Sequence, residues 1–289
     1  MLLLLLVTVI WAFSFSLIGV YLSGHVDPWF SVWIRIALAT MVFLPFIKPK
    51  QISLTVAAKL MAIGAIQLGV MYSFYYQSFL FLTVPEVLLF TVMTPIYVTL
   101  FNDLLDRKLH RHFFFSALLA TIGAIAIRYH SVNEGFLRGL VMVQGANLCF
   151  AAGQVAYKRL LAKQTQALEQ KSVFSWFFIG ALIVSSIEYL LWGDANKLPQ
   201  TTLQWGILIY LGIVASGWGY FAWNKGATQV NVGALAVTNN LLIPTGIIVN
   251  VMIWNHNADL FRLSVGAILI IAALILNQKW AKHRQHRRN

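Results

Sequence analysis

The chain consists of long apolar runs, each about the length of a membrane-spanning helix, separated by short polar connections. A helix that spans a bilayer needs about 20 mostly apolar residues. The runs of this length cover residues 2–22, 29–47, 57–78, 84–101, 112–128, 137–157, 173–192, 202–223, 233–254 and 262–279. This pattern predicts an all-α polytopic membrane protein with ten transmembrane helices.

The composition excludes several other classes of protein. Of the 289 residues, 59% are hydrophobic and 10% are charged, whereas soluble domains carry roughly 25% charged residues. The net charge of +12 does not indicate a nucleic-acid partner, because the basic residues lie in short loops between apolar runs. The single cysteine, Cys149, lies inside an apolar run, so the chain has no disulfide framework.

The distribution of lysine and arginine predicts the orientation in the membrane. With the N-terminus in the cytoplasm, sixteen of the 21 basic residues lie on the cytoplasmic side and four on the outer side. Cytoplasmic loops carry the excess of positive charge in membrane proteins. We therefore expect both termini in the cytoplasm. The N-terminal run has no basic segment before it and continues to Tyr21, so it predicts the first transmembrane helix and not a cleaved signal peptide.

The two halves of the chain resemble each other. A shift of 148 residues aligns the third predicted helix with the eighth and places Gly64 on Gly212 and Tyr72 on Tyr220. A unit of five helices is odd, so its second copy must enter the membrane in the opposite orientation, as in the inverted repeats of secondary transporters. The predicted units are residues 1–132, residues 133–280 and a basic cytoplasmic tail at 281–289.

Two prolines occupy matching places within the fourth and ninth predicted helices. A shift of 149 residues places Pro95 on Pro244. Each proline removes a backbone donor in the middle of the membrane, and the freed carbonyl is tolerated only against protein or a water-lined cavity. We expect both prolines to bend their helices around a central cavity, although kinks that only improve packing would give the same pattern.

Arg35 is the most informative residue, because it lies within the second apolar run, seven positions after Pro28. A buried guanidinium costs several kcal/mol in a bilayer and normally faces a cavity or a partner. Its paired N–H groups suit a carboxylate held by two parallel hydrogen bonds. The alternatives are that the side chain extends to the outer headgroups or that it pairs with Glu188 or Glu86.

Other polar and aromatic residues within the runs are candidates for substrate contact. Together with Arg35, the predicted substrate-binding residues are Trp11, Tyr72, Tyr75, Asn147, Trp218, Asn239 and Asn240. For the amides, the alternative is a hydrogen bond between helices, and for the tryptophans it is the aromatic belt at the membrane interface. The histidines lie in loops or the tail without metal-ligand spacing, and no catalytic or nucleotide-binding motif occurs. We expect no cofactor, no metal and no enzymatic activity.

Several segments resemble the EamA-type branch of the drug/metabolite transporter superfamily. They are WIRIALATMVFLPF, IQLGVMYSFYYQSFLFLTVPEVLLFTVMTPIYVTL, FSALLATIGAIAIRY and QTTLQWGILIYLGIVASGWGYFAWNKGATQVN. The resemblance covers nearly the whole chain except the basic tail, and it is closest to the carboxylate/amino acid/amine transporter family. It implies a secondary transporter that imports biotin across the bacterial inner membrane by alternating access. One departure is that the Gly-Glu pair which often ends the fourth and ninth helices is absent, so no role of that glutamate carries over.

Two other functions remain open at this point. The same superfamily contains exporters of amino acids and other small metabolites, and a sequence does not give the direction of transport. A membrane scaffold without a transport cycle is the second alternative, although scaffolding requires neither a repeat nor a buried arginine. The coupling ion and the oligomeric state are open as well, and a monomer is compatible with the sequence.

Overall fold

The computed structural model describes most of the chain up to residue 254 and a few single positions beyond it. The described residues are 2–105, 107, 134–164, 168–230, 232–254 and the single positions 261, 264, 265, 268, 272 and 275. Within them, every regular element is a helix and no strand occurs. The predicted spans 112–128 and 262–279 and the tail at 281–289 lie outside the described residues or are only sparsely covered by them.

The helices match the apolar runs closely, either singly or joined end to end. They are α1 (Leu2–Leu17), α2 (Pro28–Phe43), α3 (Leu54–Gly64), α4 (Met71–Ser78), α5 (Val84–Phe90), α6 (Thr94–Leu105), α8 (Glu134–Ala162), α9 (Gln170–Trp192), α10 (Thr202–Ile209), α11 (Gly219–Thr228) and α12 (Val232–Ile253). Three pairs of these helices, α3 and α4, α5 and α6, and α10 and α11, are joined by a helical turn and not by a loop. Among the described residues, seven continuous helical segments are long and apolar enough to cross a membrane.

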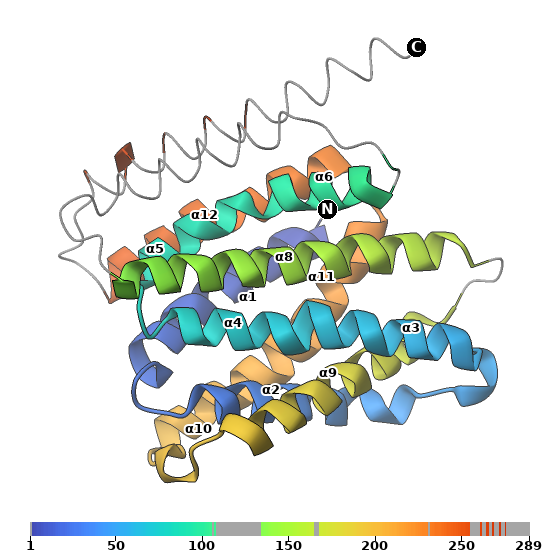
Figure 1. Cartoon of the computed structure of the whole chain (residues 1–289), viewed down its shortest axis with the longest axis horizontal. Coiled ribbons are helices and arrows are strands. Elements are labelled where there is room, and N and C mark those ends of the chain that lie inside the picture. Colours follow the sequence, from blue (N-terminus) through green and yellow to red (C-terminus); the bar gives the residue numbers. More distant parts are fainter. Residues whose placement is uncertain are drawn as a thin grey trace.

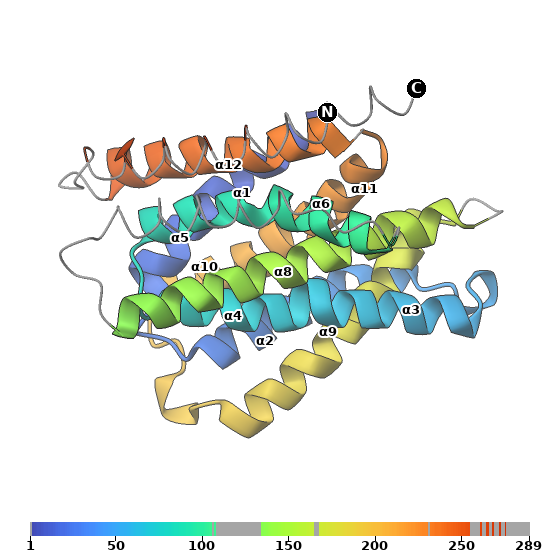
Figure 2. The ribbon, with the colours of Figure 1, turned by 45° about the horizontal axis from the view of Figure 1, so that its top comes forward.

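The helices pack as a layered bundle (Figures 1 and 2). On one side α12 lies beside α5 and α6, and on the opposite side α2 lies beside α9 and α10. Between them α1 packs on α12 and α11, while α8 packs on α4 and α6. One continuous core of buried apolar and aromatic side chains runs through these layers.

Three of the membrane-length segments change their helical geometry near the middle. The segment that joins α3 to α4 is a π-helix, η4 (Ala65–Val70), and the segment that joins α10 to α11 is a π-helix, η8 (Tyr210–Trp218). The 148-residue shift places η4 within η8. Between α5 and α6 the chain forms a 3-10 turn, η5 (Thr91–Met93). Such departures from α-helix are frequent at functional sites in membrane proteins.

Glycine at position 212 allows η8 to lie unusually close to α2. A Cβ atom built on Gly212 would lie 2.8 Å from Cβ of Leu38 and 3.2 Å from the backbone oxygen of Arg35. A larger residue would therefore separate the two segments. This close approach places Arg35 against the side chains of η8.

Candidate functional site

A cavity lies at the centre of the bundle, between the two outer layers. The empty space inside it and at its opening to solvent amounts to about 730 Å³. The lining side chains come from α1, the π-helical turn η1 (Ile18–Leu22) that follows it, α2, α4, η5, α6, α8, α11 and α12. Among the lining residues in the described part of the chain, Arg35 carries the one charged side chain.

Arg35 lies in the wall of the cavity formed by α2 and is 2% exposed. Its Nε donates to Oγ of Ser216 at 3.1 Å, its Nη1 donates to the hydroxyl of Tyr76 at 2.8 Å, and its Nη2 donates to the hydroxyl of Tyr72 at 2.9 Å. The guanidinium carbon also lies 4.3 Å from the centre of the Tyr72 ring. The side chain therefore points into the protein and does not extend to the headgroups.

Among the described residues, the guanidinium has no anionic partner, and some of its donors are unpaired. Of its five N–H groups, three have the partners just described, which leaves one on each terminal nitrogen without a partner among the described residues. The two carboxylates considered as partners bind elsewhere. Glu188 accepts from Ser73 at 2.6 Å, and Glu86 accepts from the backbone and hydroxyl of Thr83 in a capping box. All three protein groups that contact the guanidinium are neutral, so the site carries an unbalanced positive charge.

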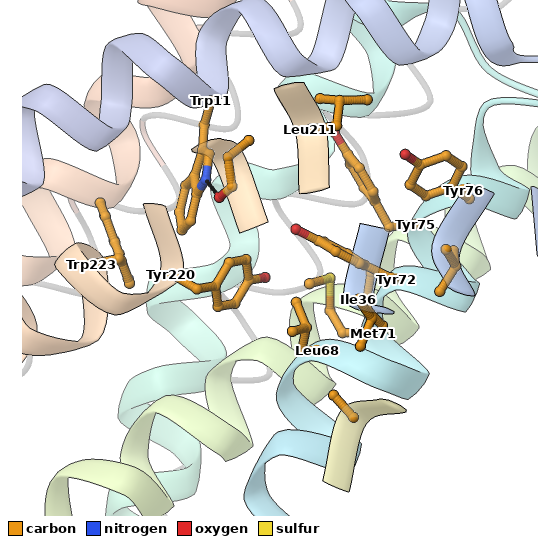
Figure 3. Close-up of a cluster of buried hydrophobic side chains, with 14 of the residues drawn as sticks. Trp11, Ile36, Leu68, Met71, Tyr72, Tyr75, Tyr76, Leu211, Tyr220 and Trp223 are labelled. Atoms are coloured by element: carbon orange, nitrogen blue, oxygen red, sulfur yellow. Dashed lines mark hydrogen bonds between the residues drawn. The ribbon is translucent and has the colours of Figure 1, made fainter. Parts of the chain in front are cut away.

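Aromatic side chains form much of the cavity wall (Figure 3). The ring of Trp11 lies 5.1 Å from that of Tyr220 and 4.9 Å from that of Trp223, and the ring of Tyr220 lies 5.8 Å from that of Tyr72. Nε1 of Trp11 donates to the backbone oxygen of Ala215 at 3.0 Å, the dashed line in Figure 3. The rings are thus held by one another and by η8, and they present a rigid apolar surface to a ligand.

Asn147 reaches the cavity, but its amide already has partners. Its Nδ2 donates to the backbone oxygen of Phe90 at 2.9 Å and to Oε1 of Gln144 at 3.2 Å, and its Oδ1 accepts from Thr94 at 3.1 Å. The 3-10 turn η5 lies directly after Phe90, and there the backbone N–H of Thr94 bonds to the oxygen of Thr91 and not, as in an α-helix, to that of Phe90. Asn147 therefore donates to a carbonyl whose α-helical hydrogen bond is lost at the break.

The two prolines have different surroundings. Pro95 is buried near the start of α6, directly after η5, and both Thr91 and Thr94 beside it line the cavity. Pro244 lies inside α12, which continues on both sides of it, and its ring is exposed. The change of helical geometry therefore occurs beside Pro95, and bending at Pro244 stays a prediction.

The structure brings together most of the residues predicted to bind a substrate. Those that line the cavity are Arg35, Trp11, Tyr72, Tyr75, Asn147 and Asn239. Trp218 does not line it, since its side chain is 41% exposed and packs on Phe43 and Phe221. The side chain of Asn240 lies outside the described part of the structure.

Some residues in the cavity wall, or in contact with it, were not predicted to belong to the site. Tyr220 lines the cavity opposite Tyr72, and its alignment with Tyr72 by the 148-residue shift was a usable signal. Ser216 contacts both Arg35 and Tyr72, at 3.1 and 3.0 Å. Nothing in the sequence distinguishes Ser216 from the other small residues of that helix, so only its position against α2 identifies it.

Comparison with known proteins identifies the family. The model of the EamA-like transporter family matches residues 1–129 and again residues 137–278. The chain belongs to the EamA-like transporter family. It is thus a multi-pass membrane transporter and not an enzyme, as the sequence resemblance implied.

Relatives within this family are similar over almost the full length. The chain is 49% identical to a protein named biotin transporter from Escherichia coli strain K12, over 98% of this chain and 95% of that protein. It is also 49% identical to a probable biotin transporter from Pseudomonas aeruginosa, over 95% of this chain and 96% of that protein. A solved crystal structure with no function in its name shares the fold, with a TM-score of 0.66 at 16% identity over 97% of this chain and 98% of that one.

Proposed function

We propose that this EamA-like transporter imports biotin across the inner membrane of a bacterium. Two relatives that share 49% of their residues with this chain carry the name biotin transporter or probable biotin transporter. Biotin has a carboxylate on an aliphatic chain, and the chain is attached to a fused ring system with a cyclic urea. A site for it needs a fixed cation, an apolar wall and polar groups for the ring.

The arrangement around Arg35 is the observation that carries the proposal. The guanidinium is buried in a cavity wall, is oriented by Tyr72, Tyr76 and Ser216, and has an N–H without a partner on each terminal nitrogen. Two such N–H groups can bind both oxygens of one carboxylate. The aromatic side chains of Trp11 and Tyr220 then face the aliphatic part of the ligand.

Transport by this site requires that it open to each side of the membrane in turn. We infer two inverted five-helix repeats, residues 1–132 and 133–280, that rock against each other around the cavity. The double match of the family model and the π-helices at related places in the third and eighth spans support this division. The excess of basic residues in alternate loops supports cytoplasmic termini, including the basic tail at 281–289.

Uptake in cells tests the function. The chain is expressed in a bacterial strain that requires external biotin and lacks its own biotin uptake, and the entry of radiolabelled biotin is followed. We expect uptake well above that of the empty vector, with competition by unlabelled biotin. Binding of biotin to the purified protein without uptake would indicate a scaffold or receptor instead.

The same cells separate import from export. Cells loaded with labelled biotin are diluted into biotin-free medium, and the loss of label is measured with and without the protein. An importer coupled to an inward gradient retains the label, whereas an exporter accelerates its loss. Collapse of the proton gradient during uptake then shows whether protons drive the transport.

A further inference from the structure

Asn239 lines the cavity and carries a buried hydrogen-bond donor that has no partner among the described residues. This donor is the Nδ2 atom of its amide. Several other buried polar atoms in the described part of the chain are also unpaired, but none of them belongs to a residue that lines the cavity. A buried donor without an acceptor costs free energy, which a bound acceptor would recover.

Several other polar side chains of the cavity already have hydrogen-bond partners. The amide of Asn147 is held by the backbone of the broken helix and by Gln144 and Thr94. The hydroxyls of Ser14 and Thr91 donate to carbonyls of their own helices at 2.9 and 2.6 Å. Asn239 is therefore the amide that remains available to a ligand.

Asn239 and Arg35 lie in different walls of the cavity. Asn239 belongs to α12, which packs on α1, α5 and α6, whereas Arg35 belongs to α2, which packs on α9, α4 and η8. Figures 1 and 2 both show α12 and α2 on opposite sides of the bundle. A ligand held by both residues would bridge the two walls, with an anion at one end and an acceptor at the other.

We propose that Asn239 is a specificity-determining residue whose Nδ2 donates to an acceptor at the end of the substrate distal to its carboxylate. This inference rests on the proposed function, in which Arg35 holds the carboxylate. For biotin the acceptor is the oxygen of the cyclic urea. The pair Arg35 and Asn239 then selects carboxylates that also carry a carbonyl acceptor at the far end, and it disfavours simple fatty acids.

The experiment compares the binding of biotin with that of 2-iminobiotin, in which an imino group replaces the urea oxygen. When this group is protonated, the ring is a cyclic guanidinium, which donates hydrogen bonds where the urea oxygen of biotin accepts one. Binding of both ligands is measured on the purified wild-type protein and on Asn239→Asp, Asn239→Leu and Arg35→Ala. Thr245→Val on the same helix, at a residue that does not line the cavity, is the matched control. Melting temperatures establish that each variant is folded.

We expect Asn239→Asp to shift the ratio of biotin affinity to iminobiotin affinity by at least tenfold toward iminobiotin, since its carboxylate accepts where the amide donated. Asn239→Leu should weaken biotin about three- to tenfold, since a single neutral hydrogen bond is lost. Arg35→Ala should weaken both ligands and leave their ratio unchanged, because both keep the carboxylate.

Two results would overturn the inference. One is an unchanged ratio of the two affinities in a folded Asn239→Asp protein that still binds biotin. The other is an Asn239→Leu protein that binds biotin as tightly as the Thr245→Val control. Failure of the wild-type protein to bind biotin at all is a different outcome, since it contradicts the proposed function itself.

Discussion

The hydroxyl of Tyr72 accepts a hydrogen bond from Nη2 of Arg35 at 2.9 Å and lies 3.0 Å from Oγ of Ser216. The second of these contacts joins α4 to η8, and the first joins α4 to α2. One tyrosine therefore connects the three segments that orient the guanidinium. Its ring also stacks under the charge, which adds a cation–π attraction.

Removal of the Tyr72 hydroxyl tests this connection. In Tyr72→Phe the ring remains and the hydrogen bond to the guanidinium is lost, so Arg35 is free to turn from its orientation. A hydrogen bond to a charged group contributes about 1.5–3 kcal/mol, and we expect biotin affinity to fall about tenfold. Tyr157→Phe, which loses a hydroxyl bonded to Gln170 away from the cavity, should leave the affinity unchanged. Equal affinities in the two variants would refute the orienting role.

Substitution of Arg35 itself distinguishes charge from geometry. Arg35→Ala should abolish measurable biotin uptake at equal membrane abundance. Arg35→Lys keeps the charge but loses the paired N–H groups, so we expect it to recover only part of the binding. Arg138→Ala removes an exposed arginine that pairs with Glu134 and should transport normally. Uptake at the wild-type rate in both Arg35 variants would exclude the carboxylate role.

Two glycines provide a matched test of the contact between α2 and η8. A Cβ atom at Gly212 meets Leu38 at 2.8 Å, whereas a Cβ atom at Gly206 meets nothing within 4 Å. We expect Gly212→Ala to push the two segments apart, with a lower melting temperature and weaker biotin binding. Gly206→Ala should instead stabilise the protein by about 0.5–1 kcal/mol, since alanine favours a helix. A Gly212→Ala protein as stable as Gly206→Ala would show that the close approach is not required.

Gln154 is a buried amide without a hydrogen-bond partner in the described part of the chain. Its side chain is 2% exposed, and neither its Nε2 nor its Oε1 has a hydrogen bond. Gln154→Met keeps a similar length without the polar atoms, so we expect a gain of about 1–2 kcal/mol in the free energy of unfolding. Gln67→Met, which breaks the hydrogen bond from Gln67 to Asn224, should give a smaller gain or a loss. Thermal unfolding in detergent compares the two.

We expect the free energy of unfolding to depend on pH through Asp27, which lies at the start of α2. Its carboxylate accepts from the backbone of Phe30 at 2.7 Å, but its burial outweighs this bond and raises the pKa of Asp27 above the ordinary value. The folded state therefore binds the proton more tightly than the unfolded state. This contribution to stability is present at low pH and is lost as the pH rises from about 4 through the raised pKa.

The Asp27→Asn variant isolates that effect. Asparagine still caps the helix and does not titrate, so the melting temperature should depend less on pH over this range than in the wild type. Glu134→Gln, which removes an exposed carboxylate, should keep the wild-type profile. An Asp27→Asn profile identical to that of the wild type would contradict the assignment.

Much of the fold could be predicted from the pattern of apolar and polar residues along the chain. Lipid cannot satisfy backbone polar groups, so each apolar run of sufficient length must be a helix. The predicted spans 57–78 and 202–223 correspond to the segments Leu54–Ser78 and Thr202–Thr228. The π-helical stretches within them were not predicted, because they depend on how glycines such as Gly212 meet a neighbouring helix.

The order of residues along the chain is enough to predict a helical membrane protein and a polar environment for Arg35, since both conclusions follow from the cost of placing polar groups in lipid. It also singled out Asn147, Trp218 and Asn239 as candidates for contact with a ligand. Only the tertiary structure separated them, because hydrogen bonds between distant helices decide which groups are already occupied. Asn147 is engaged by Phe90, Trp218 lies away from the cavity, and Asn239 keeps a free donor.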